Sequence, residues 1–481
     1  MESEGLSNFI GGDWISGRGP EAEVKNPATG RTVALFGTSV EEDVNDAVAS
    51  AEEAFHAWRD TPVTVRGAAL FSLRELLQRE KESLARTIVL ENGKTYADAI
   101  GEFERALQYV EHACAIAELM KGAISENIGA GVDTHYVREP LGVFAVIAPF
   151  NFPAMIPLYF SWAVAVGNPV VVKPSELCPL TTVRIMELVE AAGFPPGVVN
   201  MLLGGADTVN KLCSHPGVAG VSFVGSSSAA EAVFRLASQH GKRAQCQGGA
   251  KNHLLITDSA RLDRCMDNIV NSLFGSASQR CFAGSNVLVY DEIYDSFLDR
   301  LLDLVREICV GDGLTPEVGM GPVISEHALH RFHRIIDDAS QAGAKLLLDG
   351  RAVNGDSSEG YFLGPTIFEA EPGMSVFDDE VFGPIRCVKA VGDLDEAVNI
   401  VNRSRFGHSA VIYTENGGTA RRFSRMVNTG QVGVNIGTPA PIAFYPVGGR
   451  KRSFYGSLRG RANDAIDFYT DKKVIVSTWH S

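Results

Sequence analysis

The chain has 481 residues and carries 43 Lys and Arg against 58 Asp and Glu, a formal net charge of −15 at pH 7. Its 45% hydrophobic and 21% charged residues are typical of a globular protein, which excludes collagen, coiled coil and intrinsic disorder. The acidic balance argues against nucleic-acid binding, because phosphate contacts need clustered Lys and Arg. At roughly 150 residues per domain, the length predicts two to four domains.

The N-terminus and the cysteines indicate a cytoplasmic protein. The first five residues, MESEG, lack the basic and apolar regions of a secretion or import signal. The eight cysteines are scattered and none has zinc-like spacing, as expected of thiols in a reduced cytosol. One of them can still be a nucleophile, and composition leaves open which.

A stretch without charged residues, 140–172, is long enough to span a bilayer. Four prolines interrupt it, and lipid would leave the freed backbone groups unpaired. We therefore expect a buried strand, loop, helix and strand here, and no membrane association.

The N-terminal quarter is expected to be mainly helical. Ser39 to Glu42 is typical of a capping box, and apolar residues then recur at helical spacing to Trp58. Two further helices are expected over 65–91 and 102–120.

Short apolar runs then alternate with helical stretches, a pattern that predicts βαβ units and parallel sheets. In the first such region, strands are expected over 143–148, 169–173, 198–203 and 220–224, with helices over 181–192 and 207–215. In the second, strands are expected over 252–257, 285–290, 345–348 and 387–391, with helices over 294–310 and 325–342. Short strands are also expected over 133–138 and 473–479, and a loop over 354–360.

Polar residues follow the strands of the first region, where ligands of parallel sheets bind. Asn151 lies between prolines that fix its backbone, so its amide is either an oxyanion donor or a polar turn residue. Lys173 and Glu176 are placed to bind ribose hydroxyls, or else form a solvated pair. An acidic residue here would repel a 2′-phosphate, which favours NAD over NADP. Gly225 and Ser226 join a strand to a helix N-terminus that suits a pyrophosphate, although no GxGxxG is present.

Two segments in the second region carry candidate chemistry. Cys281 follows Arg280, whose positive charge would stabilise a reactive thiolate; the alternative is an inert buried cysteine. Glu380 and Phe382 lie on a Gly-Pro turn and would suit a ribose and a flat ring. The HxxHxxH pattern at 327–333 indicates a solvated helix face rather than a metal site, because no carboxylate or thiolate ligand is evident nearby.

Taken in order, the motifs PFNFP, VVKPSE, FVGSS, GGAK, QRC and EVFGP resemble the aldehyde dehydrogenase superfamily across essentially the whole chain. The segments PFNFPAMIP, GAKNH, LQYVEHAC and GQVGVN most resemble its CoA-acylating methylmalonate/malonate-semialdehyde dehydrogenases. The resemblance implies an α/β fold with a Rossmann-like NAD-binding domain (1–118 and 139–248) and an α/β catalytic domain (249–455). A small β flap (119–138 and 456–481) would join subunits into homodimers or homotetramers.

The resemblance also implies residue roles. Cys281 would attack the aldehyde, while the Asn151 side chain and the Cys281 backbone N–H hold the oxyanion. Arg105 and Arg280 would bind the carboxylate of a small anionic aldehyde. NAD would be contacted by Phe150, Lys173, Glu176, Gly225, Ser226, Glu380 and Phe382.

One departure from the superfamily bears on the reaction. Hydrolytic members carry ELGGK, and counting back from Lys251 places Gln247 at the position of its glutamate. A neutral amide is no general base, so coenzyme A would release the thioester, giving acetyl- or propionyl-CoA with decarboxylation. The alternative is a hydrolytic NAD-dependent dehydrogenase of another short anionic aldehyde, with a glutamate from elsewhere and a pocket reshaped by Phe282. A non-catalytic protein on this fold is a third reading, against which the intact Cys281 and Asn151 argue.

Overall fold

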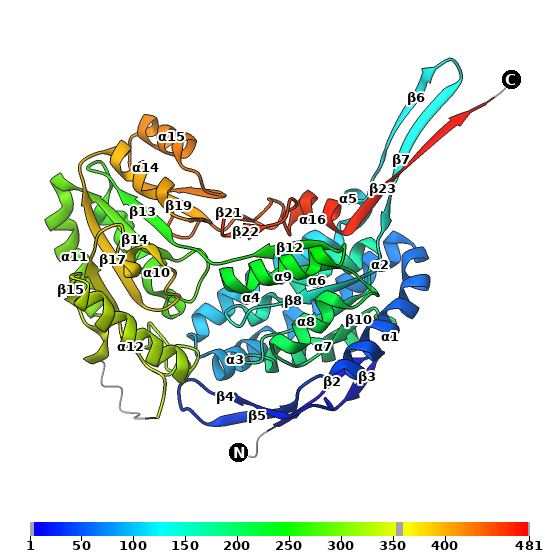
Figure 1. The fold of residues 1–481 in the computed structure, drawn as a ribbon, viewed down its shortest axis with the longest axis horizontal. Coiled ribbons are helices and arrows are strands. Elements are labelled where there is room, and N and C mark those ends of the chain that lie inside the picture. Colours follow the sequence, from blue (N-terminus) through cyan, green and yellow to red (C-terminus); the bar gives the residue numbers. More distant parts are fainter. Residues whose placement is uncertain (1–3, 353–358, 480–481) are drawn as a thin grey trace.

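The structure, a computed structural model, describes residues 4–352 and 359–479. Two large sheets, each packed with helices, lie side by side, and a narrow three-stranded ribbon projects from one end (Figure 1). The predicted α/β class is confirmed. Most of the loop expected over 354–360 lies outside the described residues.

The first sheet has eight strands, of which the central five run parallel. Alternate residues of one strand pack on opposite faces, as Phe144 and Val146 do against Ala145 and Ile147. Because helices cover both faces, these strands carry apolar runs without polar alternation. The spatial order is β22 (Phe454–Tyr455), β12 (Arg243–Gln247), β11 (Val218–Val224), β8 (Val143–Ile147), β9 (Val170–Lys173), β10 (Val199–Met201), β2 (Asn8–Ile10) and β3 (Asp13–Ile15).

Helices of the first half cover the two faces of this sheet separately (Figure 1). One face packs against α2 (Val63–Arg79), α3 (Lys81–Asn92), α4 (Tyr96–Cys114), α6 (Ile156–Val166) and α7 (Leu180–Ala191). The other packs against α1 (Glu41–Asp60), α8 (Ala206–Ser214) and α9 (Ser227–Gln239).

The uncharged stretch 140–172 forms β8, the buried helix α6 and β9, as predicted. Ten of the eleven residues of α6 are buried within the protein. Across the part of the chain that the structure describes, no helix combines the length and apolar character that a membrane crossing requires.

The second sheet has seven strands, parallel except for the edge strand β15. Its order is β15 (Lys345–Leu348), β16 (Thr366–Glu369), β17 (Ile385–Val391), β14 (Gly284–Tyr290), β13 (Asn252–Ile256), β19 (Ser409–Tyr413) and β20 (Gln431–Val434). The helices around it are α10 (Leu262–Phe274), α11 (Tyr294–Arg306), α12 (Glu326–Gln341), α14 (Leu394–Arg403) and α15 (Gly417–Met426).

The prediction of a mainly helical N-terminal quarter is wrong for residues 4–37. This segment contributes β2 and β3 to the first sheet and forms a separate sheet from β1 (Glu4–Leu6), β4 (Glu21–Lys25) and β5 (Thr32–Gly37). These strands have three to six residues, which is too short for a clear alternating pattern.

Three features of the helices also differ from the prediction. Ser39 does not cap α1, because its hydroxyl donates to Asn8 Oδ1 (3.0 Å); Asp43 instead accepts from the Val40 N–H (2.9 Å). The helix expected over 65–91 is two helices, α2 and α3, which meet at Glu80. The next helix, α4, begins earlier than predicted because Thr95 accepts from the Asp98 N–H (3.2 Å).

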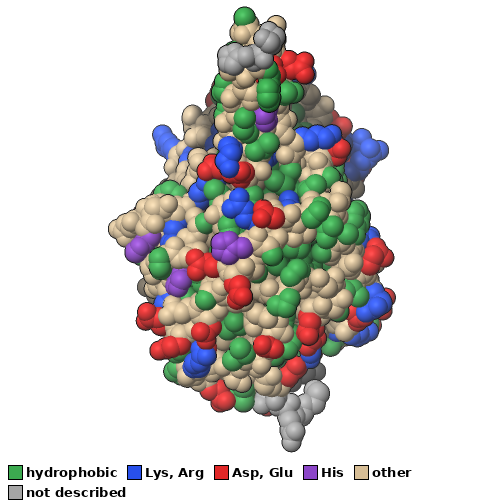
Figure 2. Space-filling model, turned by 90° about the vertical axis from the view of Figure 1, so that its right-hand side faces the viewer, with side chains coloured by type: hydrophobic (Ala, Val, Ile, Leu, Met, Phe, Trp, Pro, Cys, Tyr) green, Lys and Arg blue, Asp and Glu red, His purple; other side chains and the backbone are tan. Residues whose placement is uncertain are grey.

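The projecting ribbon, here called the flap, consists of β6 (Ala123–Gly129), β7 (Val132–Pro140) and β23 (Thr470–Thr478). Strand β23 pairs with β7 along nine residues, so the strands expected over 133–138 and 473–479 are present and longer than predicted. The flap carries apolar side chains that are exposed in the described part of the chain, and some are visible near the top of Figure 2. They include Ile124, Ile128, Val474 and Val476, each at least 60% exposed.

The buried Asn168 joins the base of the flap to the first sheet. Its Oδ1 accepts from the N–H groups of Leu141 (2.7 Å) and Gly142 (3.0 Å), and its Nδ2 donates to the Tyr469 carbonyl (2.7 Å). Three backbone groups from distant segments therefore depend on one amide.

We expect Asn168→Ala to lower the free energy of unfolding by roughly 3 kcal/mol, since it leaves three buried backbone groups unpaired. Urea unfolding followed by circular dichroism measures this. The exposed Asn463→Ala in α16 (Ala462–Tyr469) is the matched control and should change stability little. Equal stability of the two variants would contradict the role of Asn168.

Candidate active site

A cavity of about 660 Å³ lies where the two sheets face each other, within the size range of small-molecule sites. Ten of the eleven residues predicted for the site line it; Arg280 is not among the lining residues. The ten are Arg105, Phe150, Asn151, Lys173, Glu176, Gly225, Ser226, Cys281, Glu380 and Phe382.

The first sheet supplies the cavity with residues at its strand ends. Asn151 follows β8, Lys173 ends β9, Gly225 follows β11 and Gln247 ends β12. Because these strands are parallel, their carboxyl ends meet at one edge, as the sequence predicts.

One end of the cavity has groups that suit sugar hydroxyls and phosphate. Lys173 Nζ donates to the Gly204 carbonyl (2.8 Å) and pairs with Glu176 (3.4 Å), and burial lowers the pKa of this ammonium. Ser226 caps α9 by accepting from the Ala229 N–H (3.3 Å), so a helix N-terminus opens on the cavity. This end therefore combines an anion site with hydroxyl-binding side chains.

Glu380 and Phe382 close the middle of the cavity. Burial raises the pKa of Glu380 to about 7, although the hydrogen bond from the Ala250 N–H (2.7 Å) acts to lower it. Gly249 makes room for this carboxylate, since a Cβ there would lie 2.0 Å from Oε2. The Phe382 ring meets the Phe150 ring edge-on, with centroids 5.9 Å apart.

The candidate nucleophile Cys281 reaches the cavity from the second sheet. Burial raises the pKa of its thiol to about 11. The positive charge of Arg461 acts most strongly in the other direction; the Glu380 carboxylate raises the pKa, and the backbone N–H groups of Cys281 and Phe282 lower it.

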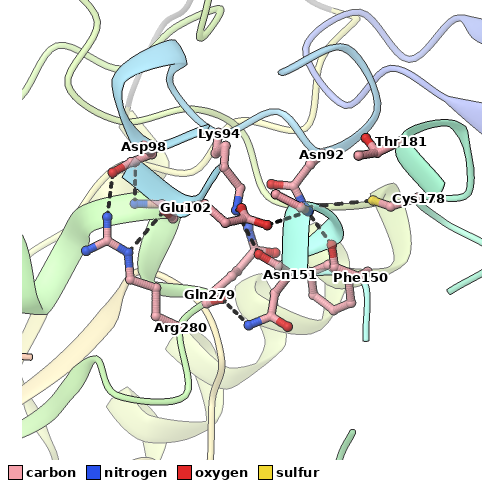
Figure 3. A network of polar contacts seen from close by, with 12 residues as sticks. Asn92, Lys94, Asp98, Glu102, Phe150, Asn151, Cys178, Thr181, Gln279 and Arg280 are labelled. Atoms are coloured by element: carbon pink, nitrogen blue, oxygen red, sulfur yellow. Dashed lines mark hydrogen bonds and ion pairs between the residues drawn. The ribbon is translucent and has the colours of Figure 1, made fainter. Parts of the chain in front are cut away.

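The loop that leads to Cys281 has an uncommon backbone. Ser276, Ala277 and Ser278 all have positive φ angles (52°, 50° and 63°), which L-residues rarely adopt. Arg280 holds this loop (Figure 3): it pairs with Asp98 of α4 (2.5 Å) and donates to the Ser276 hydroxyl (3.1 Å). The second Asp98 oxygen accepts from the Ser276 N–H (3.1 Å), so Arg280 fixes the backbone beside the nucleophile.

Asn151 belongs to a second network of polar contacts (Figure 3). Its Nδ2 donates to the Gln279 carbonyl (2.9 Å), which leaves the other N–H of the amide for a ligand. The backbone carbonyl of Asn151 accepts from the buried Lys94 (2.7 Å), which pairs with Glu102 (2.5 Å). Glu102 also accepts from the Ala154 N–H (2.7 Å), so both sides of the Asn151 loop are fixed.

The sequence interpretation missed several lining residues, above all Tyr109 and Arg461. Arg461 lies just before α16 and does not follow a strand of the parallel part of either sheet. In the basic segment that precedes it, Arg452 pairs with Glu231 (2.9 Å) and Lys451 donates to the carbonyls of Asn402 and Ser404. Only the folded chain brings Arg461 to Cys281.

The histidine pattern on α12 has no role in this cavity. His327 and His330 are exposed on the helix surface. No group of three or more His, Cys, Asp or Glu side chains suited to a metal occurs in residues 4–352 and 359–479.

Because burial raises the pKa of Cys281 to about 11, most of the sulfur is thiol at neutral pH. We expect its alkylation rate with iodoacetamide to rise about tenfold per pH unit between roughly pH 7 and pH 10, as the thiolate fraction grows. Peptide mass spectrometry measures the rate at Cys281, and the exposed Cys309 in the same digest reports reagent activity. A plateau below about pH 9 would contradict the effect of burial.

Comparison with known proteins agrees with this geometry. Malonate-semialdehyde dehydrogenase 3 of Geobacillus kaustophilus is 44% identical, with 99% of each chain covered. A structure assigned to a methylmalonate-semialdehyde dehydrogenase of Sinorhizobium meliloti, complexed with NAD, superposes with a TM-score of 0.98 at 36% identity over 100% of this chain and 99% of that one. The methylmalonate-semialdehyde dehydrogenase of Oceanimonas doudoroffii gives 0.97 at 35% identity, with 99% of each chain covered. Residues 14–475 match the profile of the Aldehyde dehydrogenase family, and the chain belongs to that family.

Proposed function

We propose that the protein is an NAD-dependent, CoA-acylating dehydrogenase of malonate or methylmalonate semialdehyde, which gives acetyl- or propionyl-CoA with decarboxylation. The printed names of the relatives support this substrate class. The observation that carries the proposal is that Gln247, a neutral amide, lines the cavity of Cys281 at the position where hydrolytic members have a glutamate.

The residues at the phosphate-binding end fit NAD. The helix N-terminus at Ser226 suits the pyrophosphate, and Gly225 lets backbone approach it. Lys173 and Glu176 suit ribose hydroxyls, and Glu380 with the two phenylalanine rings suits the nicotinamide half. When bound, NAD supplies the hydride acceptor for the oxidation.

Cys281 and Asn151 would carry the first chemical step. The Cys281 thiolate attacks the aldehyde carbon, and the oxygen becomes an oxyanion in a thiohemiacetal. The free N–H of the Asn151 amide and the Cys281 backbone N–H stabilise that charge. The Lys94–Glu102 pair serves this step indirectly, because it holds the Asn151 carbonyl.

Arg105 would bind the carboxylate of the substrate, since it lines the cavity. Arg280 would share this role only by leaving Asp98, which holds its guanidinium in this structure. Oxidation leaves a thioester on Cys281, and the thiol of coenzyme A would release it because Gln247 cannot deprotonate water.

One observation favours a second candidate function. Glu380 lines the same cavity with a pKa of about 7, which suits a general base. With Glu380 activating water, the protein would be a hydrolytic dehydrogenase of another short anionic aldehyde.

Coenzyme A dependence separates the two candidates. Without CoA we expect the wild type to release about one NADH per active site and then stop, because the thioester persists. With CoA it turns over steadily. Gln247→Glu should gain turnover without CoA, since a general base contributes roughly 10²–10⁴-fold, whereas Gln247→Asn should not.

NADH absorbance and product identification by mass spectrometry measure these outcomes. Steady wild-type turnover to free acid without CoA, abolished in Glu380→Gln, would contradict the acylating proposal and support the hydrolytic one.

We further propose a cytoplasmic homodimer or homotetramer, with the division into domains that the sequence predicts. Residues 119–138 and 456–481 would hold the subunits together. The exposed apolar side chains of the flap support this. Exposing apolar surface to water is unfavourable, and contact with a second copy of the chain would bury it.

We expect the double variant Val474→Asp and Val476→Asp to be a monomer or smaller assembly, because carboxylates would be buried without partners. Light scattering after size exclusion measures the mass. Val65→Asp on α2 is the matched control, since Val65 is also exposed (52%) but lies outside the flap. A monomeric wild type, or an unchanged mass of the double variant, would contradict the proposal.

A further inference from the structure

Three arginines line the cavity, and only one of them, Arg105 of α4, was predicted from the sequence. Arg331 donates to the carbonyl of Val381, next to Glu380 (2.7 Å). The third is Arg461, which precedes α16. Arg280, although adjacent to Cys281 in sequence, uses its donors elsewhere: on Asp98 (2.5 Å), Ser276 (3.1 Å) and Asn271 (2.9 Å). Its charge is therefore already paired.

Tyr109 holds Arg461 in place. The Arg461 guanidinium donates to the Tyr109 hydroxyl, and its Cζ lies 4.5 Å from the centre of the ring. Tyr109 is itself buried and lies four residues after Arg105 on α4, so the two side chains share one helix face. Arg105 and Arg461 thus belong to the same wall of the cavity.

This wall carries two positive charges without a carboxylate partner. Within residues 4–352 and 359–479, neither Arg105 nor Arg461 forms an ion pair, although arginines elsewhere on the protein commonly do. Arg105 donates only to the neutral Gln108 (3.0 Å). Like charges at a cavity wall repel each other, and a bound anion removes that cost.

We propose that Arg461, together with Arg105, binds the anionic group of the substrate. This inference rests on the proposed function in one respect, that the substrate is an anionic aldehyde. Arg461 and Cys281 line the same cavity, so an anion held by Arg461 lies in the cavity that also holds the reacting carbonyl.

The test uses two reagents that alkylate Cys281 with the same carbon and differ only in charge: iodoacetate and iodoacetamide. The measured quantity is the ratio of their rate constants at Cys281, followed by peptide mass spectrometry. Arg461→Gln should lower this ratio roughly 10- to 100-fold, the value of a charged hydrogen bond. Arg461→Lys keeps the charge but not the paired donors and should lower it less.

One variant serves as the control. Arg264→Gln on α10 removes an exposed charge that does not line the cavity and should leave the ratio unchanged. An unchanged ratio in Arg461→Gln would overturn the proposal.

Iodoacetamide is uncharged, so its rate constant reports the general effect of each variant on the reactivity of Cys281. A variant that slows both reagents equally leaves the ratio unchanged and is not counted as losing anion binding. If Arg461→Gln does not fold, as judged by circular dichroism, Arg461→Lys decides: a fall of about threefold or more supports the proposal, and an unchanged ratio overturns it. The assay contains no aldehyde, NAD or CoA, so its failure is distinguishable from failure of the proposed function.

Discussion

One face of helix α4 holds the catalytic cavity together. Asp98, Glu102, Arg105 and Tyr109 are spaced four, three and four residues apart, which places them on one stripe of the helix. Asp98 pairs with the loop of Cys281, and Glu102 with the lysine that holds Asn151. Arg105 lines the cavity and Tyr109 holds Arg461. The proposed nucleophile, the proposed oxyanion donor and the proposed anion-binding wall are therefore all positioned by a single helix.

The buried pairs on this stripe have a consequence for the energetics of the site. Lys94 and Glu102 are both only 2% exposed, so each carries a large desolvation cost that the partner offsets. Losing either partner would leave a buried charge, which is more costly than losing the contact alone. The cavity is also locally positive although the protein carries a net charge of −15. Attraction for an acidic substrate must therefore come from the wall itself and not from the field of the whole molecule.

The sequence predicts the parts of this site that follow parallel strands. Asn151, Lys173 and Gly225 could be placed together because strand ends of a parallel sheet meet at one edge. Of the residues on α4, only Arg105 was placed in the site, and this came from the family resemblance; a helix face has no such rule for what it meets. For Arg280 the resemblance implies a ligand contact, and the sequence did not show that its guanidinium pairs with Asp98 beside the left-handed backbone before Cys281. The short N-terminal strands escaped prediction because three to six residues show no clear period.

The segment from Arg461 to the end of the flap is continuous, and this has a geometric consequence. Helix α16 has eight residues, begins directly after Arg461 and passes without a linker into β23. A helix turns about 100° and advances about 1.5 Å per residue. A single insertion or deletion within α16 would therefore swing the guanidinium to another side of the helix while β23 kept its register with β7. The length of α16 is therefore constrained at both ends, by the position of Arg461 in the cavity and by the pairing of β23 with β7.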